Sequence, residues 1–256
     1  MKSASNKEVT LLRKLSRRKY RDKDQLFLVE GERAVEQVLT NGLVEVVSVF
    51  VNEEKAGSFQ ASAISVLLAG EIFEEVADTD NPQGILALCR MPEEIQAEKL
   101  ANESGIIVAT DAIQDPGNMG TIIRTSAWFG VKALLAGKGS VDVYHPKVVR
   151  STAGATGSVP IIQNELEDIF TSLEKTGWEI LLLDGGEGSQ NLVDIHPANK
   201  TVLVVGNEGN GIHEKLLNSG RKKVRIERAG EEKAVESLNA AVAVSIALYE
   251  VNGARS

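Results

Sequence analysis

Six short runs of consecutive apolar residues recur through the second half of the chain, separated by segments of helical length. The runs occupy residues 106–109, 133–136, 159–162, 180–183, 202–205 and 224–226. Strands that are apolar throughout must be covered on both faces, which is typical of a parallel sheet between two helical layers. The intervening segments predict helices at residues 119–129, 146–153, 165–175, 212–218 and 237–251. Residues 105–256 are therefore predicted to form an α/β domain with a parallel sheet.

The first part of the chain contains shorter elements of the same two kinds. Strands are predicted at residues 26–29, 44–51, 64–68 and 84–89, and helices at residues 6–20, 32–39 and 71–76. These elements predict a small α/β domain over residues 1–92. Residues 93–104 fall in the stretch MPEEIQAEKLANES, which carries a proline, several charges and no sustained apolar stripe. They are predicted to link the two domains.

Composition excludes several classes of protein. The single cysteine, Cys89, rules out an internal disulfide and a zinc site built from thiolates. The histidines His145, His196 and His213 are scattered and lack metal-ligand spacing, so no metal is expected. No apolar run approaches the roughly 20 residues that span a bilayer, and the N-terminus lacks the apolar core of a signal peptide. A cytoplasmic protein without a membrane partner is predicted.

The charge is distributed unevenly along the chain. The net charge is −8, yet residues 1–23 contain nine Lys and Arg residues against Glu8 and Asp22. On a continuous N-terminal helix, Arg13, Arg17 and Arg21 recur at four-residue spacing, which predicts a row of guanidinium groups on one helix face. The basic charge is therefore concentrated at one end of an otherwise acidic protein.

Two loops follow predicted strands of the second domain, where open parallel sheets bind their ligands. The first, DAIQDPGN at residues 111–118, precedes a helix for which Asn118 is the predicted N-cap, and Arg124 lies on the second turn of that helix. The other, GNEGNG at residues 206–211, has three glycines that allow positive φ and close approach of a ligand, and it carries Glu208. Each loop alone is also explained as an ordinary turn or helix cap.

A third segment, ESLNA at residues 236–240, precedes the last predicted helix, where Ser237 or Asn239 can act as the N-cap. Ser237 has no catalytic triad around it in the sequence, so hydrolase chemistry is not indicated. The glycine spacing of residues 206–211 is G-x-x-G-x-G rather than the dinucleotide pattern G-x-G-x-x-G, and no phosphate-binding P-loop occurs. A nucleotide-dependent oxidoreductase is therefore disfavoured.

In chain order, DPGNMGTIIRT (115–125), VGNEGNG (205–211) and SLN (237–239) resemble the three motifs of the SpoU (TrmH) family of RNA ribose 2'-O-methyltransferases. The resemblance covers residues 105–250. The stretch KYRDKDQLFLVEGER (19–33) is similar to the start of the small RNA-binding domain of that family, which has an L30e/L7Ae-like fold.

The resemblance implies a SPOUT-type catalytic domain with a deep trefoil knot that holds S-adenosylmethionine, preceded by the small L30e-like domain. It also implies a homodimer with the site at the subunit interface, and RNA as the substrate. Ribosomal RNA is the preferred substrate and transfer RNA the alternative. A catalytically inactive RNA-binding member of the same fold is the second alternative. The basic N-terminus is then predicted to contact RNA phosphates through the side chains of Arg13, Arg17, Arg18 and Arg21, unless these form a merely solvated helix face.

The family motifs also imply roles for individual residues. The cofactor would lie against Gly206, Ile226 and Leu238. The polar residues of the active site would be Asn118, Arg124, Glu208, Ser237 and Asn239. Because a guanidinium group has no acceptor and a pKa above about 12, Arg124 is expected to orient the substrate and stabilise charge rather than act as the base. The chain departs from the family pattern after Ile226, where Glu227 replaces the usual proline and the loop of residues 229–236 is longer.

Overall fold

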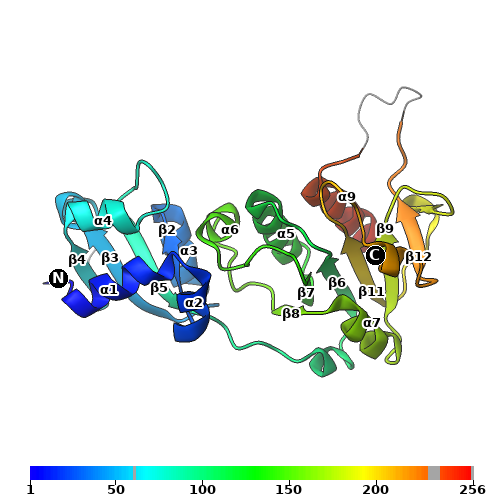
Figure 1. Cartoon of the computed structure of the whole chain (residues 1–256), viewed down its shortest axis with the longest axis horizontal. Coiled ribbons are helices and arrows are strands. Elements are labelled where there is room, and N and C mark those ends of the chain that lie inside the picture. The colour runs from blue at the N-terminus through cyan, green and yellow to red at the C-terminus, as the bar shows by residue number, and fades with distance from the viewer. Residues whose placement is uncertain (60–61, 230–236, 255–256) are drawn as a thin grey trace. The chain divides into compact units, whose positions relative to one another are not determined.

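The computed structural model describes residues 1–59, 62–229 and 237–254. The chain divides into two compact units (Figure 1). The first contains Met1–Glu93 and Asp142–Ser158, and the second contains Glu94–Val141 and Val159–Ser256. Within the described ranges, no helix is both long and apolar enough to cross a membrane.

The first unit is a five-stranded sheet between two helical layers. The strand order is β1-β4-β3-β5-β2, with β5 antiparallel to β2 and β3 and the other pairs parallel. The strands are β1 (Lys2–Ser3), β2 (Leu26–Glu30), β3 (Val46–Asn52), β4 (Ser65–Leu68) and β5 (Ile85–Arg90). One face is covered by α1 (Asn6–Leu15) and α4 (Gly70–Val76), and the other by α3 (Glu32–Asn41) and α6 (Pro146–Ser151). A 3-10 helix, η1 (Glu53–Ser58), follows β3.

The single N-terminal helix predicted at residues 6–20 is wrong, because the chain breaks into α1 and α2 (Arg18–Asp24). Arg17, between them, has extended backbone with φ −103° and ψ 129°. Arg21 stabilises the break: its Nη1 donates to the carbonyls of Leu15 (2.7 Å) and Ser16 (2.9 Å). These carbonyls lie at the C-terminus of the helix and have no partner within it. The buried guanidinium supplies the hydrogen-bond donors that a further helical turn would have provided. The expected row of arginines on one helix face does not exist.

Residues 142–158 follow a part of the second unit in sequence but pack in the first unit, which differs from the domain boundaries predicted above. The Arg21 guanidinium is 2% exposed and pairs with the Asp142 carboxylate, Nη2 to Oδ2 at 2.5 Å. Val149 of α6 is buried in the core beneath α3. Gly157 has φ +86°, and a Cβ there would lie 2.4 Å from a methyl group of Val44, so only glycine fits.

The second unit confirms the predicted α/β domain with a parallel sheet. Its seven strands are all parallel, in the order β10-β12-β9-β11-β6-β7-β8. They are β6 (Gly105–Thr110), β7 (Ala133–Gly137), β8 (Ile161–Asn164), β9 (Glu179–Leu183), β10 (Gln190–Asn191), β11 (Lys200–Val205) and β12 (Lys222–Arg225). Strand β10 was not predicted, because it is two polar residues long.

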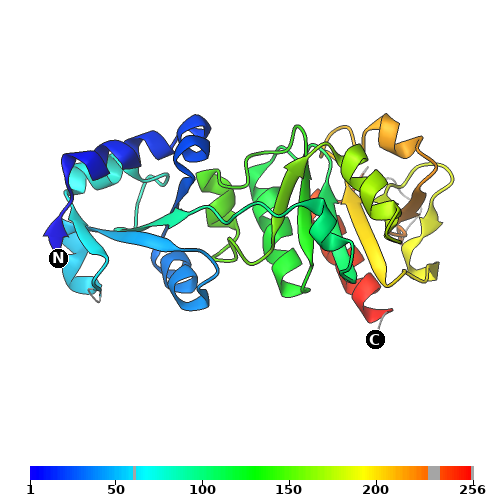
Figure 2. The ribbon, with the colours of Figure 1, turned by 90° about the horizontal axis from the view of Figure 1, so that it is seen from below.

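Helices cover both faces of this sheet. On one face lie α7 (Leu166–Glu174) and α8 (Glu214–Leu217), and on the other α5 (Pro116–Trp128) and α9 (Ala240–Gly253) run side by side (Figures 1 and 2). Two 3-10 helices complete the unit, η2 (Ala97–Leu100) and η3 (Leu192–Asp194). Leu100 is buried and its carbonyl accepts a hydrogen bond from Trp178 Nε1 at 3.2 Å. The segment predicted as a linker is therefore, from Glu94 onward, part of the second unit.

Candidate active site

The central strands β6 and β11 deliver two loops to the same edge of the sheet. Their last residues, Thr110 and Val205, are paired in register, so the first loop (residues 111–115) and the second loop (residues 206–211) leave side by side. Asn207 Nδ2 of the second loop donates to the Ala112 carbonyl of the first at 2.8 Å, and the His213 amide, just beyond the second loop, donates to Asp111 Oδ2 at 2.7 Å. Both loops therefore lie together at the carboxyl edge of the sheet.

The Glu208 carboxylate binds back onto the first loop and the start of α5. Its Oε1 accepts from Asn118 Nδ2 at 2.9 Å and from the Asp115 amide at 3.2 Å, and Oε2 accepts from the Gln114 amide at 3.3 Å. Burial alone would raise the pKa of Glu208. Hydrogen bonds from Asn118 and from main-chain amides outweigh that effect and hold the pKa below its ordinary value. The carboxylate is therefore charged at neutral pH and serves as an acceptor.

The third loop (residues 237–239) joins the same network. Asn239 Nδ2 donates to Asn118 Oδ1 at 2.8 Å, while its own Oδ1 accepts from the amides of Ala241 (3.0 Å) and Val242 (3.3 Å) as the N-cap of α9. Asn118 is buried and uses its amide oxygen toward Asn239 and its amide nitrogen toward Glu208. The three loops, from distant parts of the sequence, are thus joined through one buried side chain.

Two details of the sequence prediction need correction. The N-cap of α5 is Asp115, whose Oδ1 accepts from the Asn118 amide at 2.7 Å, and Pro116 occupies the first helical position. Asn118 therefore lies inside the first turn, where its side chain is free to bind across the loops. The sequence Asp-Pro-Gly is a local signal that identifies Asp115 as the cap. The last helix begins at Ala240 rather than at residue 237.

Gly206 is required by the second loop itself. It is not among the glycines with positive φ. A Cβ at this position would lie 2.1 Å from the carbonyl carbon of Gly211 and 2.2 Å from the amide nitrogen of Ile212. The loop closes there because the main chains of Asn207 and Gly211 exchange two hydrogen bonds, each 2.9 Å. The tight closure, rather than an unusual φ, excludes any side chain.

The remaining assigned residues lie at the surface near this network. Arg124 on α5 is exposed and makes no hydrogen bond or ion pair with the residues that the structure describes. Ser237 is exposed, Leu238 is 49% exposed, and Ile226 is half-buried directly after β12. The structure thus joins Asn118, Glu208 and Asn239, whereas Arg124 and Ser237 are not bonded to them. Of the longer loop predicted at residues 229–236, residues 230–236 lie outside the described ranges.

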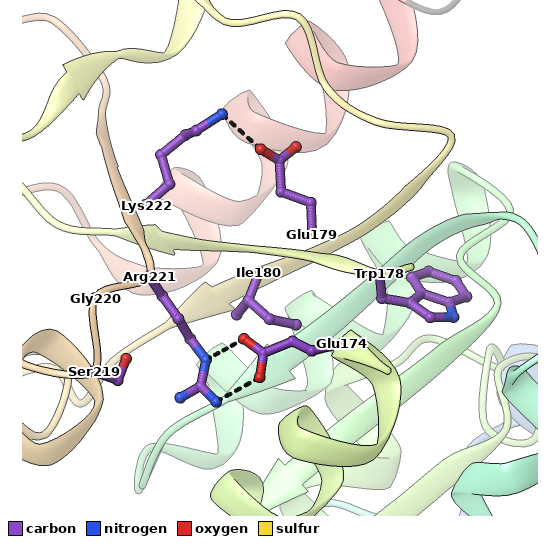
Figure 3. Close-up of a pocket in the computed structure, with 8 residues that line it drawn as sticks. All are labelled: Glu174, Trp178, Glu179, Ile180, Ser219, Gly220, Arg221 and Lys222. Carbon is purple, nitrogen blue, oxygen red and sulfur yellow. Dashed lines mark hydrogen bonds and ion pairs between the residues drawn. The ribbon is translucent and has the colours of Figure 1, made fainter. Parts of the chain in front are cut away.

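A surface pocket lies at the opposite edge of the sheet, at the first residues of β9 and β12 (Figure 3). Its charged groups are already paired: Arg221 binds Glu174 (2.7 Å) and Glu167 (2.9 Å), and Lys222 binds Glu179 (2.6 Å). The carboxylates of Glu174 and Glu167 raise the pKa of Arg221 despite its burial. This closed ion-pair network stabilises the fold and leaves no charged group for a ligand. Among the described residues, no cluster of His, Cys, Asp or Glu is suited to a metal ion.

A parallel sheet with a polar network at its carboxyl edge is an open α/β fold of the class that binds ligands at the ends of its central strands. Residues 105–249 match the SpoU rRNA Methylase family, and residues 6–87 match the MRM3-like substrate binding domain. The chain belongs to the SpoU rRNA methylase family. The resemblance drawn from the sequence motifs is thereby confirmed.

The similarity to known proteins extends over nearly the whole chain. The 23S rRNA (guanosine(2553)-2'-O)-methyltransferase RlmP of Bacillus subtilis is 33% identical over 99% of both chains. The 23S rRNA (uridine(2479)-2'-O)-methyltransferase of Streptomyces viridochromogenes is 26% identical over 92% of this chain and 85% of its own. The crystal structure of an AdoMet-bound rRNA methyltransferase from Sinorhizobium meliloti superposes with a TM-score of 0.83 at 26% identity, covering 99% of this chain and 97% of that one.

Proposed function

We propose that this protein transfers a methyl group from S-adenosylmethionine to a ribose 2'-hydroxyl of large-subunit ribosomal RNA. The observation that carries the proposal is the hydrogen-bonded link from Glu208 through Asn118 to Asn239, which unites the three family motifs at the carboxyl edge of the sheet. Similarity to the Bacillus 23S rRNA enzyme over both units supports ribosomal RNA as the substrate. The whole-length similarity includes the unit that would select the RNA.

The residues near the second and third loops fit the cofactor. Leu238 is half-exposed and Ile226 is half-buried at the end of β12, so apolar side chains are available to cover an adenine ring. The main chain at Gly206 carries no side chain that would obstruct a ligand. Bound S-adenosylmethionine supplies the electrophilic methyl group. Gly206, Ile226 and Leu238 would hold it, as proposed from the motifs.

The polar residues would align the ribose and stabilise charge. Asn118 and Asn239 each use one amide N–H in the network and retain a second for the substrate. Arg124 has no acceptor, so it would orient the RNA and stabilise negative charge that develops on the 2'-oxygen. Ser237 would add a hydroxyl group beside them. Alignment of oxygen, carbon and sulfur for in-line attack is itself worth several kcal/mol of barrier lowering.

The RNA-contacting surface that we propose differs from the one predicted by sequence. Arg21 is withdrawn from it, since it is buried against Asp142. Arg13 is paired with Glu75 and Arg18 with Asp22, and both arginine side chains remain partly exposed. Within residues 14–23, the exposed cations without an acidic partner among the described residues are Lys14, Arg17, Lys19 and Lys23. These four would make the principal contacts with phosphates.

Three further features belong to the proposal. Helix α9 is apolar on nearly all sides, and Val242 and Tyr249 on it and Trp128 on α5 are 46%, 68% and 86% exposed. Such a surface supports a homodimer formed through α5 and α9. The family membership supports a trefoil knot through which the C-terminal segment is threaded, and a cytoplasmic location where ribosomal RNA is modified.

The test is to map 2'-O-methyl groups on total RNA from cells with and without the gene, and to repeat the modification with purified protein, S-adenosylmethionine and the unmodified RNA. Loss of one methylated ribose in 23S RNA, restored in vitro, is the expected result. Loss of a transfer RNA methyl group instead would reassign the substrate. Cofactor and RNA binding without any methyl transfer would identify a non-catalytic RNA-binding protein.

A further inference from the structure

Asn207 in the second loop makes several side-chain hydrogen bonds, although the sequence motifs assigned it no role. Its Oδ1 accepts from the amides of Gly209 (2.9 Å) and Asn210 (3.1 Å), which fixes the turn of its own loop. Its Nδ2 donates across to the Ala112 carbonyl of the first loop at 2.8 Å. The two amide donors and the carbonyl acceptor permit only this orientation of the side-chain amide.

The bond to Ala112 holds a backbone conformation that is costly on its own. Ala112 has φ +55°, in the left-handed region that a residue with a Cβ rarely adopts. Such a conformation persists only where its surroundings enforce it. Here the enforcing contact comes from the second loop, because Asn207 binds the carbonyl of the strained residue itself.

Asn207 also lies next to the central acceptor of the site. Its Nδ2 is 3.4 Å from Glu208 Oε2, and Glu208 accepts from the amides of Gln114 and Asp115, two and three residues beyond Ala112. The positions of the Glu208 carboxylate and of the main-chain amides that bind it therefore both depend on Asn207. The side chains of Asn118 and Asn239 are positioned in turn, because Asn118 is hydrogen-bonded to Glu208 and Asn239 is hydrogen-bonded to Asn118.

We infer that Asn207 is a positioning residue for methyl transfer, acting through its cross-loop hydrogen bond to Ala112, which presets the network of Glu208, Asn118 and Asn239. The inference rests on the proposed function and extends it to a residue that does not touch the substrate. Misplacement of reacting groups by a fraction of an ångström to an ångström costs up to about 100-fold in rate.

Two substitutions separate the functions of this side chain. Asn207→Asp keeps an oxygen that can accept from the amides of Gly209 and Asn210 but replaces the donor to Ala112 with an acceptor. Asn207→Ala removes all of these bonds. The matched controls are Asn210→Asp and Asn210→Ala, in the same loop and with the same change of charge. The Asn210 side chain is exposed and makes no hydrogen bond to the described residues.

Single-turnover methylation at saturating S-adenosylmethionine and RNA should slow by about 10- to 100-fold in both Asn207 variants and stay within about twofold in both controls. The melting temperature and the KM for RNA should be close to those of the wild type. In the cofactor-free protein, hydrogen–deuterium exchange of residues 111–118 should become faster in both Asn207 variants and stay unchanged in the controls.

A wild-type rate in Asn207→Asp would overturn the inference, because that variant has lost the cross-loop donor to Ala112. Unchanged exchange of residues 111–118 would also overturn it. Failure of the wild-type protein to methylate RNA would instead overturn the proposed function, and the exchange measurement would still decide whether Asn207 holds the first loop.

Discussion

Arg124 is exposed on α5 and makes no hydrogen bond or ion pair with the residues the structure describes, unlike Asn118, Glu208 and Asn239. A side chain with no structural partner can be removed at little cost in stability. Arg124→Ala should therefore keep its melting temperature and its affinity for S-adenosylmethionine while the methyl-transfer rate falls by about 100-fold or more, the scale of removing one donor at developing charge. Single-turnover methylation at saturating cofactor measures this. A rate near that of the wild type would remove Arg124 from the mechanism.

Leu238 and Gly206 offer contrasting tests of the cofactor site. Leu238 is 49% exposed, so Leu238→Ala leaves no cavity in the core. If the ligand covers this side chain, burial of the side chain contributes about 1.5 kcal/mol to binding, and Leu238→Ala should weaken S-adenosylmethionine binding by about tenfold. Gly206→Val forces a side chain into the main chain of Gly211 and should instead destabilise the fold by about 2 kcal/mol. Calorimetry paired with melting curves separates the two. Unchanged cofactor affinity in Leu238→Ala would contradict its assignment.

At the scale of elements, α2 presents one buried and one exposed face. Arg21 points inward to Asp142, while Lys19 and Lys23 are exposed. Replacing both lysines with glutamine should lower RNA affinity and reduce the slope of log affinity against log salt by about 1 to 2, with stability unchanged. Arg21→Ala should instead cost about 3 kcal/mol of stability, because it leaves the Asp142 carboxylate buried and unpaired. The control is Lys99→Gln with Lys175→Gln in the second unit. An unchanged salt slope in the Lys19 and Lys23 variant would show that α2 is only a solvated face.

The elements also show which parts of the fold could be predicted. The strands β6, β7, β9 and β11 could be predicted because burial on both faces leaves a continuous apolar run. The break between α1 and α2 could not, because the group that pairs with Arg21 lies 121 residues further along the chain. The same holds for the bond between Asn118 and Asn239, which depends on the folded sheet. The motifs identified the residues of the network, whereas only the structure shows that Asn118 joins the other two.

At the scale of the whole molecule, the exposed aromatic side chains on α5 and α9 bear on assembly. Trp128 and Tyr249 are 86% and 68% exposed, an unusual state for large apolar groups in a monomer. Trp128→Glu with Tyr249→Glu should convert a dimer to a monomer, because burying two charges in an apolar interface is prohibitive. Sedimentation equilibrium measures the mass, and Val193→Glu, at another exposed apolar site (62%), is the control. A wild-type protein that sediments as a monomer would contradict the proposed dimer.

The inclusion of residues 142–158 in the first unit affects how the protein is made. Domains of a nascent chain usually fold in order as each emerges from the ribosome. Here the first 93 residues emerge without Asp142, the partner of Arg21, and without Val149, which fills the core beneath α3. That core must wait, with apolar surface uncovered, until translation has passed residue 158, which lies beyond both β6 and β7. Synthesis thus has an interval in which the first unit is incomplete and exposes apolar surface, a condition that favours aggregation.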